Sequence, residues 1–386
     1  MAAISDVDAI VLRAPENDVG DFDSSAETVV LLVHDEDGNV GIGEADAPAP
    51  LIRELALMED RHAWSRGLRG VLRGRDPFEI ASLHRDLYQL TIYHGRRGLG
   101  VHALSAVDIA LHDLVGKQLG RPTYQLLGGA CHEAIRPYAT IYPGVPRGRT
   151  IGELMDDIAG RFERALELGF RAVKMEVLFG DLVTDRELVR CIQEGRRLVG
   201  DDTTLLVDFG YRWTDWRAAL WTLNRLEDSD LYLAEATLQH DDLDGHARLA
   251  ARAETRIGGA EMAATRFECR EWIERGGVDV LQPDVNRAGG LTEMKRIAEL
   301  AEDRGVLLVP HGWKTGITAA AARHFQAATP NVAFVEHLSA ELFDSPLRRE
   351  LVSPEPRLAD GAIELPRAPG LGVELDDSAV ERYRVS

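Results

Sequence analysis

Six short apolar segments between Leu205 and His337 constrain the fold of this chain more than any other feature. Each segment ends in an acidic residue or a histidine, and the successive ends lie 27, 26, 23, 27 and 25 residues apart. Such spacing is typical of a repeated unit made of a buried strand, a loop, a helix and a second loop. It predicts a parallel α/β barrel, in which the carboxyl ends of the strands line one mouth. The segments are LLVD, YLAE, IGGAE, DVLQPD, LLVPH and AFVEH, and their ends are Asp208, Glu235, Glu261, Asp284, His311 and Glu336 with His337.

The length of the chain leaves room for more than a barrel. An α/β barrel takes roughly 250 residues, so about 130 of the 386 residues belong to another unit. The alternation of strands and helices begins only after Gly128 and Gly129. We therefore expect a first domain over residues 1–130, a barrel over residues 131–355 and a C-terminal segment over residues 356–386 that returns to the first domain.

The first domain shows strands followed by helices, which is the order of a small α+β domain. Strands are expected over residues 10–13, 28–33 and 40–44. A helix is expected over residues 101–119, where apolar residues recur with a helical period.

Several helix starts carry capping signals. The sequence Asp76–Glu79 favours the start of a helix in the first domain, and Thr150–Glu153 and Thr184–Glu187 are capping boxes in the barrel. The first barrel strand is expected over residues 135–142 and the last of eight over residues 332–336.

Two loops of the first domain, residues 18–25 and 46–51, are polar or contain proline. Loops of this kind often carry function and can close over a neighbouring domain. We expect both loops to reach the barrel mouth and to set which substrate is accepted.

Charge and composition disfavour several classes of function. The net charge of -20 disfavours a nucleic-acid or anionic-membrane surface. No apolar stretch approaches the ~20 residues that span a bilayer, and the opening residues MAAISDVDAIVLR show no signal-peptide pattern. Three cysteines are too few and too scattered for a disulfide framework. We therefore expect a cytoplasmic protein without nucleic-acid or membrane partners.

Three of the strand-end acids suggest a metal site. Asp208, Glu235 and Glu261 end three consecutive predicted strands, so their side chains should converge. A small set of carboxylate oxygens, completed by water and substrate oxygens, suits Mg²⁺ better than Ca²⁺.

Asp284 and His311 end the next two strands. A carboxylate bonded to one imidazole nitrogen fixes the tautomer and leaves the other nitrogen free for proton transfer. One histidine among 12 would mean little by itself, but the adjacent strands make this pairing possible. We expect His102, His112 and His337 to be packing or surface residues.

Four further positions are candidates for contact with a substrate. Lys174 and Glu176 alternate on the second barrel strand and project to one side, where Lys174 would pair with a substrate carboxylate. Lys314, on the loop after His311, and Tyr138, on the first barrel strand, are further candidates for substrate binding.

With these residues in place, the chain resembles the enolase superfamily, and within it the group typified by mandelate racemase. The similarity covers nearly the whole length and includes HALSAVDIALHDLVGKQLGRPTYQLLGG, QPDVNRAGGLTE and PGLGVEL. The resemblance implies an N-terminal α+β capping domain, a modified (β/α)₇β barrel and an essential Mg²⁺ held by Asp208, Glu235 and Glu261. It also implies that the His311–Asp284 dyad moves a proton, and that Glu336 hydrogen-bonds a substrate carboxylate oxygen and stabilises the enolate dianion.

The resemblance is incomplete at two positions. The family often has Lys-x-Lys on the second strand, where the second lysine is the base for the opposite face of the substrate. Here Lys174 matches the first lysine and Glu176 replaces the second, which counts against a racemase. Gly210 stands where the family often has an asparagine, so a side-chain contact near the metal is lost but no ligand is.

Together these features predict a Mg²⁺-dependent dehydratase of a sugar acid, an aldonate or an aldarate. His311 would remove the C2 proton, the metal and Lys174 would stabilise the enediolate, and loss of the 3-hydroxyl would give a 2-keto-3-deoxy acid. Loss of the 3-hydroxyl needs an acid. Glu176 would either be that acid or bind a distal hydroxyl, and the protonated His311 could be the acid if the elimination is syn. A racemase, epimerase or cycloisomerase is the alternative, and an inactive binding homologue is the least favoured reading. The family resemblance also implies a homo-oligomer.

Overall fold

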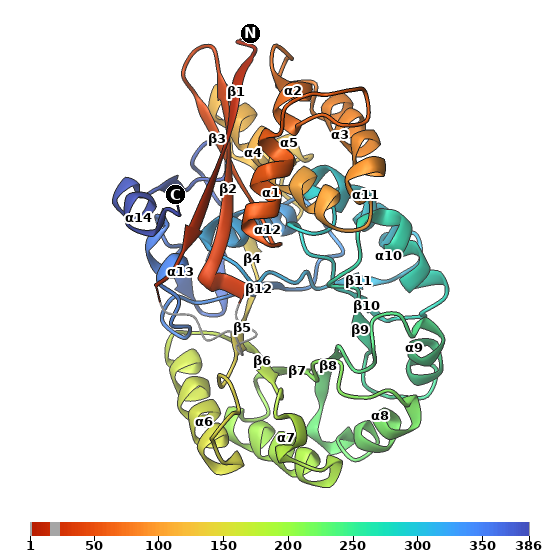
Figure 1. Cartoon of the computed structure of the whole chain (residues 1–386). Coiled ribbons are helices and arrows are strands. Elements are labelled where there is room, and N and C mark those ends of the chain that lie inside the picture. The colour runs from red at the N-terminus through yellow and green to blue at the C-terminus, as the bar shows by residue number, and fades with distance from the viewer. Residues whose placement is uncertain (1, 16–23, 386) are drawn as a thin grey trace.

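A small antiparallel sheet with its helices stands against a barrel of parallel strands in the computed structural model of this chain (Figure 1). The structure describes residues 2–15 and 24–385. In these residues the barrel has eight strands, and seven helices alternate with them along the chain. The predicted combination of an α+β domain and a modified (β/α)₇β barrel is therefore confirmed.

The first domain opens with three strands in the order β1-β2-β3. They are β1 (Ile4–Arg13), β2 (Glu27–Asp35) and β3 (Val40–Ala45), and the 3-10 helix η1 (Ser24–Ala26) precedes β2. The helices that follow are α1 (Ala49–Leu57), α2 (Leu68–Leu72), α3 (Ile80–His94), α4 (Leu99–Leu119) and α5 (Thr123–Leu126).

Helix α4 packs closely across β3 because a glycine lies where the two elements cross. A Cβ atom on Gly43 would lie 1.9 Å from the carbonyl oxygen of Ala106, so any larger residue would push the helix away. Asp113 also ties α4 to other segments: its carboxylate accepts the backbone N–H groups of Ile42 (2.9 Å) and Leu371 (2.7 Å).

Among the helices of the described residues, α4 is the one long and apolar enough to cross a membrane by length and composition, a property that inspection of the sequence missed. The helix has 21 residues, and its apolar window has a mean hydropathy of 1.3. That window is 89% buried inside the protein, so α4 is a core helix of the first domain.

The barrel strands are parallel and close into a ring. β12-β5-β6-β7-β8 form one sheet and β11-β10-β9 another, and bridges from Ala234 to Ile257 and from Leu308 to Val332 join the two. The strands are β5 (Pro137–Ile141), β6 (Ala172–Glu176), β7 (Thr204–Asp208), β8 (Leu231–Glu235), β9 (Gly258–Gly259), β10 (Val280–Leu281), β11 (Leu307–Leu308) and β12 (Val335–His337).

A ring of helices surrounds these strands (Figure 1). Both predicted capping boxes are present, at Thr150 and Thr184, and fix the starts of the first two helices. The ring consists of α6 (Ile151–Glu167), α7 (Asp185–Val199), α8 (Trp216–Leu223), α9 (Leu243–Ala250), α10 (Thr265–Glu274), α11 (Gly290–Glu302) and α12 (Gly316–Ala327). The 3-10 helices η2 (Gly180–Leu182) and η3 (Glu227–Ser229) lie in the connecting loops.

Several predicted boundaries are wrong. β1 begins at Ile4 and not at residue 10, and β12 covers Val335–His337 and not residues 332–336. The helix expected to start at Asp76 begins at Ile80, because the Asp76 carboxylate accepts the N–H of Phe78 (3.0 Å) and closes a separate turn. The strand expected over residues 135–142 is two strands, β4 (Ala134–Ile135) and β5. It divides because β4 pairs with β15 of the C-terminal segment, whereas β5 pairs inside the barrel.

The C-terminal residues form small elements that reach the first domain. The backbone N–H of Val385 donates to the carbonyl of Val11 (2.9 Å), and Arg384 forms an antiparallel bridge with Leu12. The elements are α13 (Pro346–Glu350), β13 (Val352–Ser353), β14 (Leu358–Ala359), β15 (Ala362–Glu364), β16 (Glu374–Leu375) and α14 (Asp377–Tyr383).

Candidate active site

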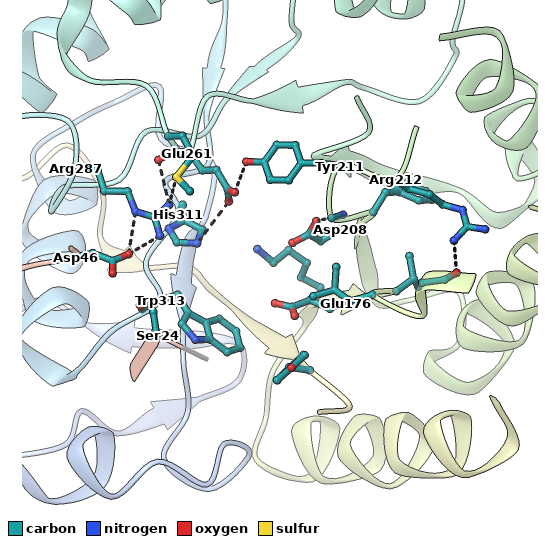
Figure 2. Close-up of a pocket in the computed structure, with 18 of the residues that line it drawn as sticks. Ser24, Asp46, Glu176, Asp208, Tyr211, Arg212, Glu261, Arg287, His311 and Trp313 are labelled. Carbon is teal, nitrogen blue, oxygen red and sulfur yellow. Dashed lines mark hydrogen bonds and ion pairs between the residues drawn. The ribbon is translucent and has the colours of Figure 1, made fainter. Parts of the chain in front are cut away.

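A cavity of about 1010 Å³ lies at the carboxyl ends of the barrel strands, between the barrel and the first domain. Residues 46–48 of one predicted loop line it. Of the other predicted loop, residues 18–23 lie outside the described residues, and Ser24 lines the cavity. The barrel side is lined by charged residues from several strand ends (Figure 2).

The predicted histidine–aspartate pair is present at this cavity. His311 follows β11 and Asp284 follows β10, and the Nδ1 of His311 lies 2.6 Å from the Oδ2 of Asp284. Asp284 is fully buried and also accepts the backbone N–H of Asn286 (2.6 Å), which fixes its orientation. Because Nδ1 is engaged, Nε2 is the nitrogen of His311 that is left for a substrate.

The surrounding charges keep His311 basic. Burial lowers the pKa of His311, and so does the nearby Arg287, but the carboxylates of Glu261, Asp284 and Glu336 outweigh both and raise it to about 9. The ligand-free site therefore favours the imidazolium form near neutral pH. A cation that shared the charge of Glu261 would weaken this attraction and favour the neutral, basic form.

Lys174 joins two buried carboxylates beneath the cavity. Its Nζ lies 2.9 Å from Glu235 and 2.9 Å from Glu336. Burial lowers the pKa of Lys174, but the two carboxylates raise it well above its usual value. Both contacts therefore favour the charged form of Lys174.

Unbalanced negative charge gathers on the other side of Lys174. Burial and the carboxylates of Glu235 and Glu261 raise the pKa of Asp208 to about 8, although Lys174 opposes the change. Burial and Asp208 likewise raise the pKa of Glu176 well above its usual range. One lysine does not neutralise this group of acids.

The donor set fits a divalent cation. Asp208 and Glu235 end the neighbouring strands β7 and β8, Glu261 follows β9, and hard oxygen donors suit Mg²⁺. As the side chains lie, no group of three possible ligands within the described residues is arranged to hold an ion. Glu235 instead accepts hydrogen bonds from Lys174 (2.9 Å) and Gln282 (2.6 Å). The metal site remains a prediction, supported by the chemistry of its donors and by the raised pKa values of Asp208 and Glu235. The pKa of Glu261 is lowered instead, because His311 and Arg287 outweigh its burial.

Strained backbone marks the same three strand ends. Tyr211, Ala236 and Ala260 have φ values of 59°, 48° and 83°, in the left-handed region that residues other than glycine rarely adopt. Each stands within three residues of a predicted metal ligand. Strain of this kind clusters at functional sites, where the surrounding structure enforces it.

The structure places three candidate residues elsewhere than at the cavity wall. Tyr138 is fully buried inside the barrel, where its ring lies 5.4 Å from the Nζ of Lys174, and it does not line the cavity. Glu336 does not line the cavity either: Lys174 and His311 outweigh burial and lower its pKa to about 2. Its carboxylate accepts the N–H of Gly312 (2.8 Å) and lies 2.9 Å from the Nζ of Lys174, and its hydrogen bond with a substrate carboxylate stays a prediction.

Lys314, the third of these residues, ties the two domains together. It is buried, lies 3.2 Å from the Oδ1 of Asp46 and donates to the backbone carbonyl of Glu27 (2.8 Å). Arg287 binds the other oxygen of Asp46 through Nε (2.9 Å). Burial opposes ionisation of Asp46, but both cations lower its pKa. This cluster connects the first domain to the barrel beside the cavity.

Sequence reasoning also missed several residues of the cavity wall. Its members, apart from those described above, include His102, Tyr211, Arg212 and Trp313. His102, expected to be a packing or surface residue, lies at the wall with its Nδ1 2.9 Å from the backbone oxygen of Asp46. One signal was available, since Tyr211 and Arg212 lie within four residues of the strand-end acid Asp208 and directly follow Gly210.

Comparison with known proteins agrees with this geometry. The model of the mandelate racemase / muconate lactonizing enzyme N-terminal domain matches residues 14–128, and that of the enolase C-terminal domain-like family matches residues 157–379. The chain is 33% identical over 370 residues to D-galactarolactone cycloisomerase of Agrobacterium fabrum, covering 94% of this chain and 93% of that protein. It is 31% identical over 366 residues to arabinonate dehydratase of Saccharolobus solfataricus, covering 93% of this chain and 91% of that protein.

Solved structures give the same result. The crystal structure of a candidate racemase is 43% identical, with a TM-score of 0.93 over 99% of this chain and 98% of that one. A racemase from Streptomyces coelicolor with bound magnesium is 28% identical, with a TM-score of 0.83 over 99% of this chain and 100% of that one.

A capped barrel with acids and a histidine at the strand ends defines the enolase type of enzyme. This chain belongs to the mandelate racemase and muconate lactonizing enzyme family of that superfamily. Its curated relatives are named as sugar acid dehydratases and as cycloisomerases.

Proposed function

We propose that this chain is a Mg²⁺-dependent dehydratase of a sugar acid, an aldonate or an aldarate, and that its product is a 2-keto-3-deoxy acid. One observation carries the proposal. A buried histidine–aspartate pair, His311 with Asp284, faces a cavity in which Glu176 stands on the far side instead of a second lysine (Figure 2). The site thus offers one base and one carboxyl group.

These residues divide the reaction into two steps. The Nε2 of His311 takes the C2 proton, and the electron pair of the C–H bond moves into the carboxylate to give an enediolate. The C2–C3 double bond then forms as the C3–O bond breaks, and the hydroxyl leaves as water with a proton from the site. The resulting enol tautomerises to the 2-keto acid.

Two groups can supply the proton to the departing hydroxyl. The raised pKa of Glu176, caused by burial and by Asp208, favours a protonated carboxyl group that can donate. The protonated His311 can return its proton if elimination is syn.

The carboxylate cluster, through a bound cation, and Lys174 stabilise the negative charge of the substrate carboxylate. When bound at Asp208, Glu235 and Glu261, a divalent cation would supply positive charge for that carboxylate and for the negative charge that develops on it. Lys174 lines the cavity as a permanent cation and adds to the same stabilisation.

Cycloisomerisation is the second candidate, because a relative at 33% identity is a D-galactarolactone cycloisomerase. That reaction class and dehydration both begin with removal of one proton next to a carboxylate. Racemisation is less favoured here, because it needs a base on each face and Lys174 is paired twice and fully charged.

The test is a panel of aldonates, aldarates and sugar lactones, each incubated with the protein and increasing Mg²⁺. A dehydratase forms water and a 2-keto acid, which carbonyl reagents detect, whereas a cycloisomerase changes the ring form without losing water. His311→Asn should abolish both product formation and exchange of the C2 proton in D₂O. Two-sided C2 exchange without dehydration would refute the proposal and favour an epimerase.

A further inference from the structure

Tyr211 lies on the cavity wall, and in Figure 2 it stands between the predicted metal ligands Glu261 and Asp208. Its hydroxyl donates a hydrogen bond to the Oε1 of Glu261. The other carboxylate oxygen of Glu261 lies 3.6 Å from the Nε2 of His311, beyond hydrogen-bonding distance. Glu261 therefore stands between the phenol and the imidazole, and the phenol restrains its rotation (Figure 2).

The backbone at Tyr211 and at the residue before it is in the left-handed conformation. Tyr211 has a φ of 59°, in the left-handed region that L-residues rarely adopt. Gly210, just before it, has a φ of 57°, and a Cβ there would lie 2.0 Å from the Cδ2 of Leu178. Two successive left-handed residues turn the chain sharply after Asp208 and direct the tyrosine into the cavity.

Hydrogen bonds on both sides fix this turn. The N–H of Tyr211 donates to the carbonyl of Ala236 (2.6 Å), and the Nε2 of Gln239 donates to the carbonyl of Tyr211 (2.6 Å). The next residue, Arg212, is held by Asp185 (2.9 Å). A loop restrained in this way keeps the hydroxyl in one place.

We propose that Tyr211 is a positioning residue that acts through Glu261. Its hydroxyl occupies one oxygen of the carboxylate, so that the other oxygen is directed toward the cation site and stays out of a hydrogen bond with the Nε2 of His311. Groups that hydrogen-bond a ligating carboxylate commonly change metal affinity or activity by about 10–100-fold when they are removed. The inference rests on the proposed function only in taking Glu261 as a metal ligand.

A matched pair of variants tests the role. Tyr211→Phe removes only the hydroxyl at the cavity. Tyr383→Phe is the control, because the hydroxyl of Tyr383 also donates to a glutamate, Glu350 (2.9 Å). Tyr383 lies in helix α14, so this hydrogen bond is lost outside the cavity. Isothermal titration with Mg²⁺ alone gives Kd for each variant, and thermal melting gives Tm.

We expect Tyr211→Phe to raise the Kd for Mg²⁺ by about tenfold and to lower kcat more than it changes KM. Tyr383→Phe should leave Kd and kcat at the wild-type values, although both variants lose one tyrosine–glutamate hydrogen bond. Equal values of Kd and kcat in the two variants would overturn the inference.

A double-mutant cycle shows whether the effect passes through Glu261. In a Glu261→Gln background, with Mg²⁺ raised to millimolar concentrations, adding Tyr211→Phe should change Kd no further. Additive effects would overturn the inference. If Tyr211→Phe weakens Mg²⁺ binding but the wild-type protein dehydrates no sugar acid, the proposed function fails while the role of Tyr211 stands. If the wild-type protein binds no Mg²⁺, both fail.

Discussion

Asp284→Asn is the substitution that separates the charge of the dyad from its shape. Asparagine has nearly the same size as aspartate and can still accept the backbone N–H of Asn286. It has no negative charge, and its amide can present a donor to the Nδ1 of His311 instead of an acceptor. The variant should fold normally and hold the imidazole in the wrong tautomer.

The expected magnitude follows from the geometry of the pair. The 2.6 Å contact between His311 and Asp284 is buried and charge-assisted, and such a hydrogen bond contributes about 1.5–3 kcal/mol. Its loss should lower the pKa of His311, now about 9, because Asp284 is one of the groups that raise it. A weaker and misoriented base should reduce turnover by at least about 10²-fold.

Turnover against pH, with dehydration and C2 exchange in D₂O followed together, measures this effect. Because Asp284→Asn lowers the pKa of His311, the acid side of the profile should move to lower pH. Asp279→Asn is a suitable control, since Asp279 precedes the same strand, β10, and accepts the backbone N–H of Ile257 (2.9 Å) at the opposite end of the barrel. Turnover in Asp284→Asn close to that of Asp279→Asn would refute the reasoning and mean that His311 acts without its aspartate.

Three other outcomes are expected. Glu235→Gln should remove most Mg²⁺ affinity in isothermal titration while circular dichroism stays unchanged; undiminished binding would contradict its role as a ligand. Glu176→Gln should raise KM if the residue binds a hydroxyl, but should collapse kcat while C2 exchange survives if it donates the proton to the leaving group. Burial and Arg323 lower the pKa of His324 from 6.5 to about 3 in the folded protein. As pH falls below 6.5, His324 becomes protonated in the unfolded chain but not in the folded one, so the free energy of unfolding decreases. Urea unfolding should show a loss from this group of about 2 kcal/mol between about pH 7.5 and about pH 5, and His324→Gln should lack that part of the loss.

The fold was predictable because its signals are local. Strand ends such as Asp208 and Glu235 stand at regular intervals, and the capping boxes at Thr150 and Thr184 are formed by residues three positions apart. The boundary at Ile135 was not predictable, because its partner strand β15 lies more than 200 residues along the chain. Local sequence does not contain that pairing.

In the candidate site too, contacts between neighbouring strands were predictable and contacts between distant segments were not. The His311–Asp284 pair could be predicted because neighbouring strands place successive strand ends side by side. Lys314 was assigned to the substrate because the sequence does not reveal Asp46, a partner from the other domain. Tyr138 was misassigned for a different reason. Alternation along a strand tells which side chains face the barrel interior, but not at which depth they lie.

The contact between the two ends of the chain has a consequence for biosynthesis. β1 is the outer strand of its sheet. Among the described residues its remaining edge meets Gly74 and Arg75 at one end, and Arg384 and Val385 at the other. The part of this edge that meets residues 384 and 385 therefore stays open until those residues have been synthesised, which is after the barrel. Open edges recruit other chains unless charges interrupt them. Asp6 and Asp8 place two such charges within β1.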